Sequence, residues 1–397
     1  MDSLTQIALG AAVAEVTLGK KIGNKAILWG AVGGTIPDLD VLANPFLSEL
    51  QALAFHRGIT HSFLFSVLGA LLFGWIVHHI YETKHHNLIA GISWSAFYAI
   101  IAISIMFLTN IVIIQLGAIL VLSALVFSCY RKYRDRPLPG LNTTLRDWQA
   151  LFFWTIFTHP LLDSCTTYGT QLFQPFSSYR VAFNNISVAD PLYTIPLIIA
   201  LIAITFYPKE NHKRRVIIWS AIVISSLYMA LTFWNKSRVN DIFVNSLESE
   251  QIDYQRYMTS PSILNNVLWF CLAETETEHV FGLYSFFDTE KKVILYKLPK
   301  NWDLLAANKD DTTVNTLAWF SNDYYNVMKR KDGGLQINDM RFGTYDGNAT
   351  NEKSFIFSFG VEKDAQGNYQ IFDEQTGPPA DRRIHIFKGL WERIKGI

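Results

Sequence analysis

Long apolar runs dominate the first 234 residues of this chain and limit what it can fold into. Residues 62–81 contain no Asp, Glu, Lys or Arg, and the runs 88–108 and 111–130 are of similar length. About 20 consecutive apolar residues are enough for an α-helix to cross the hydrocarbon part of a bilayer. The chain is 50% hydrophobic and only 17% charged, which points the same way. We therefore expect an integral membrane protein.

Shorter apolar runs lie between and around these three. We expect eight membrane-embedded segments in all, the other five being residues 4–18, 26–36, 148–162, 191–207 and 216–234. Gly30, Gly33 and Gly34 would let helix backbones approach closely in a bundle. The pattern predicts a mainly α fold, a polytopic membrane helix bundle, and leaves open whether residues 4–18 and 148–162 cross completely.

The composition of the sequence changes at about residue 235. From there it is polar and charged, with strand-like pieces at 292–298, 355–359 and 383–387 and a turn signal at Gly333 and Gly334. A stretch of this length can bury its own core. We expect residues 1–234 to form a membrane-embedded helical domain and residues 235–397 a C-terminal extramembrane α+β domain, whose role the sequence leaves open.

The basic residues predict how the chain is threaded. Four connections, at residues 20–25, 82–87, 131–146 and 207–215, hold 13 of the 15 Lys and Arg residues of the first 234. The positive-inside rule places such connections in the cytoplasm. With alternating crossings, the other connections and the C-terminal domain then lie on the extracytoplasmic side of the inner (cell) membrane.

Two carboxylates and two imidazoles fall together in the apolar half, at Asp38, Asp40, His56 and His61. Polar groups stranded in apolar surroundings are costly, and a bound cation is the simplest compensation. Asp38 and Asp40 are two residues apart, so both face one site only in an extended or turn-like segment. Pro37 favours such a segment because it restricts Ile36 away from helical geometry. Asp and His ligands suit Zn²⁺ first, with Mn²⁺ or Mg²⁺ as alternatives.

A second polar pair, His159 and Asp163, lies at the end of the run 148–162. If this segment is helical, the two side chains are four residues apart and share a face. The alternating topology brings them to the side of the membrane that holds the first cluster. Asp190, just before the next apolar run, suits either a helix cap or a further ligand.

These residues predict a metal centre that acts on water. We assign the metal ligands to Asp40, His56, His61, His159 and Asp163. Asp38 would take a proton from the activated water, and Arg57 would either clamp an anionic group or pair with a carboxylate of the site. The simpler interpretation, a loop turn with a helix cap and ordinary core histidines, remains open for each residue alone.

The same motifs resemble a known family. The matching residues are Pro37-Asp38-Leu39-Asp40, His56-Arg57-Gly58-Ile59-Thr60-His61-Ser62, and His159 with Asp163 followed by Thr167-Tyr168-Gly169. They resemble the YdjM-like membrane-bound proteins described as metal-dependent hydrolases, over roughly residues 1–190. Many members have a His where this chain has Gln6, so no ligand is assigned there. The resemblance implies a metal-assisted hydrolase in the inner membrane.

Two classes of function follow. The first is a hydrolase that cleaves ester or phosphoester bonds of lipid or membrane-proximal substrates by metal-activated water. The second is not enzymatic: a scaffold or transporter with a structural metal or a polar cluster. A formal net charge of zero gives no indication of nucleic-acid binding. The lipid bilayer is the expected partner, and a protein partner of the C-terminal domain stays open.

Overall fold

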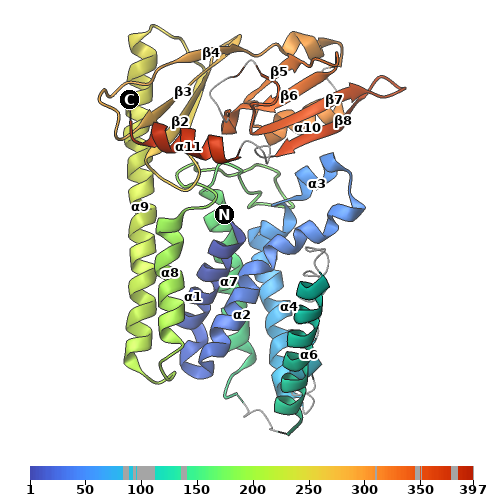
Figure 1. Ribbon diagram of the computed structural model, residues 1–397, viewed down its shortest axis with the longest axis vertical. Helices are drawn as coiled ribbons and strands as arrows, with labels where there is room; N and C mark the ends of the chain where they lie inside the picture. The colour runs from blue at the N-terminus through green and yellow to red at the C-terminus, as the bar shows by residue number, and fades with distance from the viewer. Residues whose placement is uncertain are drawn as a thin grey trace.

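A computed structural model describes residues 1–83, 89–92, 95, 112–135, 141–308, 311–344, 349, 351–376 and 383–396. The fold is mostly helical, and two antiparallel sheets follow the helices at the C-terminal end of the chain (Figure 1). The predicted segment 88–108 lies almost entirely outside the described residues.

The N-terminal part of the chain is built from helices. They are α1 Ser3–Ile22, α2 Asn24–Thr35, η1 Pro37–Phe46, α3 Glu49–Phe55, η2 Ile59–His61, α4 Phe63–Glu82, α6 Val112–Asp135, α7 Leu145–Ser164, α8 Pro191–Ile204 and α9 His212–Ser249. Side-chain caps begin several of them, because the first N–H groups of a helix have no partner within it. Asp2 caps α1, Thr144 caps α7 and Asp190 caps α8.

Two helices of the described residues are long and apolar enough to cross a membrane, α4 and α9. The pair α2 and η1, bent by 45°, would be a third if it forms one span. The predicted segments 4–18 and 148–162 lie within α1 and α7, and 191–207 begins with α8, a shorter apolar helix. A helical membrane part is therefore supported, whereas eight crossings remain a prediction.

The chain bends where α2 meets η1. We expected Pro37 to hold Ile36 out of helical geometry, and this is wrong: Ile36 has φ −51° and ψ −46°. Pro37 instead begins the 3₁₀ helix η1, where its fixed φ suits the first helical position. Asp38 and Asp40 consequently lie in a tight helical turn and not in an extended segment.

Helices α1 and α2 pack with their backbones in close contact. A Cβ atom placed on Gly34 would lie 2.5 Å from the carbonyl oxygen of Gln6, so only glycine fits there. Gly10 and Gly30 face each other in the same interface. Small residues at such positions are typical of helix pairs in membranes.

The C-terminal part contains two four-stranded antiparallel sheets, each with its strands in sequence order. The first comprises β1 Arg256–Pro261, β2 Leu268–Glu274, β3 Glu278–Ser285 and β4 Tyr296–Pro299, and the second β5 Tyr325–Lys329, β6 Leu335–Asp339, β7 Phe357–Lys363 and β8 Tyr369–Thr376. Shorter helices accompany them: η3 Trp302–Asn308, α10 Thr312–Phe320, η4 Met340–Phe342 and α11 Arg383–Ile394.

Two local predictions for this part meet different outcomes. The turn signal is confirmed, because Gly333 has a φ of +90° between β5 and β6. The strand expected at 383–387 is wrong, since these residues begin α11. The alternation of Arg383-Ile-His-Ile-Phe covers only five residues, which is too short to distinguish a strand from a helix end.

Helix α9 joins the two parts without a break. It has 38 residues and runs from the far end of the helical part up to the first sheet (Figure 1). Val239, Phe243 and Leu247 on its last turns are fully buried against Trp269 and its neighbours in β2 and β3. The expected domain boundary at residues 234 and 235 therefore falls inside a continuous helix.

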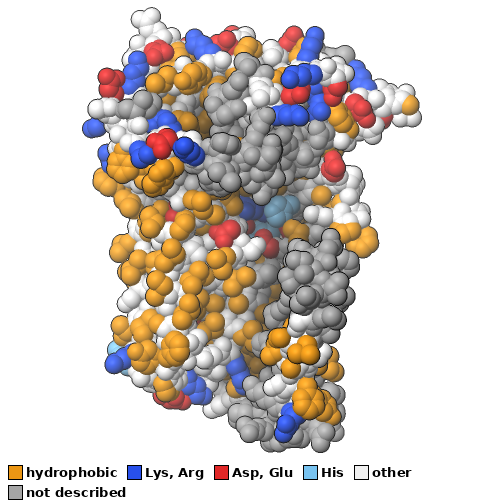
Figure 2. Space-filling view, in the orientation of Figure 1, with side chains coloured by type: hydrophobic (Ala, Val, Ile, Leu, Met, Phe, Trp, Pro, Cys, Tyr) orange, Lys and Arg blue, Asp and Glu red, His pale blue; other side chains and the backbone are white. Residues whose placement is uncertain are grey.

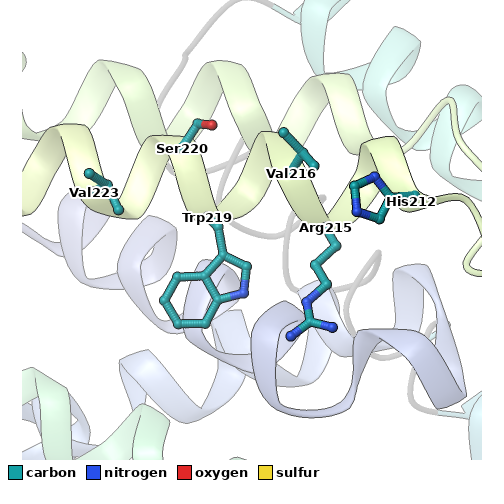
Figure 3. A pocket seen from close by; sticks show the side chains of 6 residues that line it. All are labelled: His212, Arg215, Val216, Trp219, Ser220 and Val223. Carbon is teal, nitrogen blue, oxygen red and sulfur yellow. The ribbon is translucent and has the colours of Figure 1, made fainter.

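Basic side chains gather at the end of the helical part that lies farthest from the sheets. The Nζ of Lys21 is 2.6 Å from Asp147, and Lys209 donates to the carbonyl oxygen of Lys21. An open hollow at the same end of α9 is lined by His212, Arg215, Val216, Trp219, Ser220 and Val223 (Figure 3). Basic and aromatic side chains are typical of a membrane–water interface.

Candidate metal centre

Four side chains from three separate elements converge at the end of the helical part that lies nearest the sheets. Asp38 comes from η1, His61 from η2, and His159 with Asp163 from the last turns of α7. Their ligand atoms all lie within 4.8 Å of one another. Acidic, basic and histidine side chains are visible together in a recess where the helical part meets the sheets (Figure 2).

The distances between these atoms suit a small divalent ion. His61 Nε2 lies 3.5 Å from Asp38 Oδ1 and 3.4 Å from Asp163 Oδ2. His159 Nε2 lies 3.3 Å from each of the same two oxygens. A tetrahedron with bonds of about 2.0–2.1 Å, the usual lengths for zinc, has edges of about 3.3–3.4 Å.

The buried atoms of this group lack hydrogen-bond partners. His61, His159 and Asp163 are at most 1% exposed, yet His61 Nε2, His159 Nε2 and Asp163 Oδ2 make no hydrogen bond. Buried polar atoms are nearly always satisfied, and each exception calls for an explanation such as an ion. The residues present therefore fit a divalent metal ion.

A contact at Nδ1, the ring nitrogen that does not belong to the group, orients each of the two imidazoles. His159 Nδ1 lies 2.6 Å from the carbonyl oxygen of Gly34, which can only accept, so Nδ1 carries the proton. His61 Nδ1 lies 3.1 Å from the Thr60 hydroxyl. A hydrogen bond to one ring nitrogen leaves the other free as a ligand, an arrangement common around metal-binding histidines.

The second oxygen of Asp163 is held by several donors. Gln6 donates an N–H to Oδ1 at 3.0 Å, Arg57 Nη2 lies 3.3 Å away, and the amine of Met1 also contacts this oxygen. Gln6 thus lies beside the site although its Oε1 makes no hydrogen bond. The sequence signal for this position was the resemblance described above, in which many members have a His where this chain has Gln6.

Asp40 and His56, which we assigned as ligands, lie beside the four-residue group and outside it. Asp40 Oδ1 lies 3.1 Å from His56 Nδ1, and its Oδ2 accepts the backbone N–H of Arg57 at 3.0 Å. Asp40 Oδ2 is also 3.6 Å from His61 Nδ1, an ion-pair distance that is too long for a hydrogen bond. The His56 side chain is 30% exposed.

Arg57 connects the site to its surroundings. Its φ of 56° is unusual for a residue with a side chain, and its backbone N–H and side chain are both held, by Asp40 and by the Thr166 hydroxyl at 3.0 Å. The side chain is buried, and its Nε has no hydrogen-bond partner. Asp190, in contrast, is the cap of α8, accepts from the Tyr228 hydroxyl and lies outside the group.

Tyr168 connects the site to the C-terminal part of the chain. The Tyr168 ring lies 5.4 Å from His56 and 5.2 Å from Phe320 of α10, and the Arg57 guanidinium lies over the ring at 4.9 Å. Leu53 of α3 belongs to the core of the second sheet. We did not predict this contact from the sequence, because nothing in residues 235–397 indicates what they pack against.

Arg180 lies on the same tyrosine. Its guanidinium is 4.7 Å from the Tyr168 ring centre, and it also lies over Trp319 and Phe320. Burial lowers the pKa of Arg180 to about 10, the Tyr168 hydroxyl opposes this, and the charges of Arg341 and Arg57 lower the pKa further. Burial also raises the pKa of Tyr168.

Comparison with known proteins gives one match. The family model described as YdjM inner membrane protein matches residues 1–239, more than half of the chain. No curated protein and no solved structure matches. The family and the apolar helices together indicate a membrane location. The chain belongs to the YdjM inner membrane protein family.

Proposed function

We propose that this protein is a membrane-bound, metal-dependent hydrolase. The observation that carries the proposal is the set of unpartnered buried atoms on His61, His159 and Asp163. Two imidazoles and one carboxylate are a ligand set that catalytic zinc sites use, with a further position left for water. Zn²⁺ is the first candidate, and Mn²⁺ or Mg²⁺ are alternatives.

Asp38 differs from the other three residues because its side chain is 22% exposed. It lies at the open edge of the group, within 3.5 Å of both imidazoles. A divalent ion held by His61, His159 and Asp163 would supply a water molecule whose pKa is lowered towards neutrality. Asp38 accepts the proton of that water, because it is the carboxylate that solvent reaches.

Arg57 would steady the anionic group of the substrate. Its guanidinium is buried beside Asp163 and retains an unused N–H at Nε. Asp40 fixes the Arg57 backbone and holds His56, so its part in the proposal is to position neighbours and not to bind the ion.

The substrate would be a lipid or membrane-proximal ester or phosphoester. Aromatic side chains near the site face outwards, with Phe46 at the end of η1 87% exposed and Phe176, after the loop paired to Arg57, 85% exposed. Exposed Phe side chains can be buried at the boundary between the headgroups and acyl chains of a bilayer. In this proposal the protein crosses the inner membrane several times, and the site lies on the extracytoplasmic side.

The metal content of the detergent-purified protein tests the proposal. Elemental mass spectrometry should find an ion in the wild type and in Asp38→Asn, but not in His61→Ala or His159→Ala. Asp38→Asn should then fail to hydrolyse a panel of lipid esters and phosphoesters that the wild type cleaves. Thermal unfolding of each variant controls for loss of fold.

Three other outcomes would contradict the proposal or part of it. A wild type without metal, even after supplementation, would leave the cluster as an ion-pair network and favour a scaffold. Metal-loaded Asp38→Asn with wild-type hydrolysis would exclude this residue as the base. A stable fold only with metal present, and no hydrolysis of any substrate, would indicate a structural ion.

A further inference from the structure

Arg180 carries a buried positive charge that no carboxylate in the described part of the chain neutralises. Among the described residues, no carboxylate forms an ion pair with it, and its Nη2 donates only to the carbonyl oxygens of Tyr168 and Gly169. Its Nε and Nη1 are buried and make no hydrogen bond. Leaving charged donors buried without an acceptor is expensive.

Arg57, which forms an ion pair with Asp163, lies against the same tyrosine ring. Both guanidinium groups lie within 5 Å of the Tyr168 ring centre, at 4.9 Å and 4.7 Å, and both have an unused Nε–H. Arg341 lies near them but is neutralised by Asp339, which its Nη2 meets at 2.6 Å. The two arginines without enough acceptors therefore lie around one phenol.

The balance of charge gives the same indication. The carboxylates of Asp38 and Asp163, and that of Asp40 beside them, would be offset by a divalent ion, Arg57 and the Met1 amine. The charge of Arg180 then has no counterpart among the described side chains. A buried, uncompensated cation beside a metal centre favours an anion in the same place.

We propose that Arg57 and Arg180 form a subsite for a phosphate group of the substrate, next to the metal centre. This rests on the proposed function and narrows its substrates to phosphoesters. The planar guanidinium matches phosphate oxygens through paired N–H donors. A phosphate group also offers more acceptor oxygens than a carboxylate, which has two.

The C-terminal part holds this subsite in place. Trp319 and Phe320 of α10 lie against the Arg180 guanidinium at 5.1 Å and 4.9 Å, and Trp319 donates to the carbonyl oxygen of Ser178. Arg341 lies over Phe320 and reaches the carbonyl oxygen of Thr167 at 3.4 Å. In the proposal, the residues beyond the family match position the arginine that recognises the substrate.

Phosphate binding to the full chain tests the subsite. Inorganic phosphate is titrated calorimetrically into metal-loaded, detergent-purified protein, and a short-chain phosphatidic acid is titrated in a parallel series. Arg180→Gln should weaken phosphate binding at least tenfold, and Arg180→Lys should weaken it less because the charge remains. Tighter binding of the phosphatidic acid than of phosphate would identify a lipid source, and equal binding a soluble phosphoester.

Arg238→Gln is the matched control. Arg238 also stacks on aromatic rings, those of Trp234 and Phe286, but lies on α9 outside the subsite, so phosphate binding should not change. Equal metal content with unchanged phosphate affinity in Arg180→Gln and Arg180→Lys would overturn this inference alone. Absence of metal from the wild type would overturn the proposed function as well.

Discussion

The two imidazoles of the centre show how much a single contact decides at the residue scale. The carbonyl oxygen of Gly34 determines which nitrogen of His159 carries the proton, and Thr60 performs a related task for His61. A sequence motif identifies the histidines, but not the atoms behind them. Gly34 lies far from His159 along the chain, so no local pattern could have paired them.

Thr60 provides a test of this orientation. Thr60→Val keeps the shape of the side chain but removes the acceptor for His61 Nδ1–H, so metal affinity should fall about 10–100-fold. Thr60→Ser keeps the hydroxyl and should bind metal as the wild type does. Competition with a chelator of known affinity measures the difference. Equal affinity in the valine variant would show that the hydroxyl does not orient His61.

His279 predicts a pH dependence of stability in the first sheet. Burial lowers its pKa from 6.5 to about 4, against a hydrogen bond to the Tyr325 carbonyl oxygen that raises it. Between these pH values the unfolded chain binds a proton that the folded one does not, so the free energy of unfolding decreases as the pH is lowered from 6.5 to 4, by up to about 3 kcal/mol.

Hydrogen exchange in β2 and β3 of the full chain, followed from pH 7 to pH 4, measures this effect. His279→Gln keeps a donor for Tyr325 but does not titrate, so protection should be nearly independent of pH. A variant with the same pH profile as the wild type would assign the effect to other groups.

At the scale of elements, the sequence predicted some features of the site and missed others. The four-residue spacing of His159 and Asp163 predicted a shared helix face, and the two side chains do lie 3.3 Å apart on α7. Asp38 and Asp40 were expected to face one site, and both lie near His61, but the 3₁₀ turn of η1 also brings Asp38 to His159 and Asp40 to the Arg57 backbone. The spacing of two residues determines which way their side chains point only when the backbone conformation is known. Pro37 is compatible both with an extended segment and with the first turn of a helix.

The packing of α1 on α2 gives a prediction at this scale. Gly34→Ala would push the added methyl group into the backbone of α1, which should destabilise the fold by about 1–3 kcal/mol and weaken metal binding through His159. Gly117→Ala on α6 is the control, because no atom lies within 4 Å of its added Cβ. It should be neutral or slightly stabilising.

Thermal unfolding and metal content of both variants decide the matter. An alanine at Gly34 that leaves the melting temperature and the ion unchanged would mean that the two backbones are not in contact in the membrane.

At the scale of the whole molecule, the threading can be tested. Basic side chains at Lys21, Lys209 and Arg214, from two of the four basic connections, cluster at the end opposite the sheets. The positive-inside rule then places Glu210 in the cytoplasm and Asp332, in the β5–β6 turn, outside the cell membrane.

Single cysteines at these two positions, in a variant without Cys129, Cys165 and Cys271, give the measurement. A membrane-impermeant thiol reagent applied to intact spheroplasts should label Asp332→Cys but not Glu210→Cys. Inverted vesicles should give the reverse pattern. Labelling of Glu210→Cys from outside would reverse the topology, and with it the proposed location of the site.

Composition was sufficient to predict a helical membrane part followed by a mixed domain, because burial and polarity act along the whole chain. It was not sufficient to predict how the two meet. Tyr168, Arg180 and Trp319 form that contact through cation–π interactions. No regular spacing in the sequence indicates which aromatic and basic residues will meet in this way.

Helix α9 fixes the rotational orientation of the C-terminal part relative to the helical part. Each residue of an α-helix adds 1.5 Å and about 100° of rotation, so a single insertion between Trp234 and Val239 would turn the whole C-terminal domain away from Tyr168. The family match ends at residue 239, within this helix. A domain joined in this way tolerates changes of length only in near-whole turns, so variation in the linking segment should occur in steps of about seven or eleven residues.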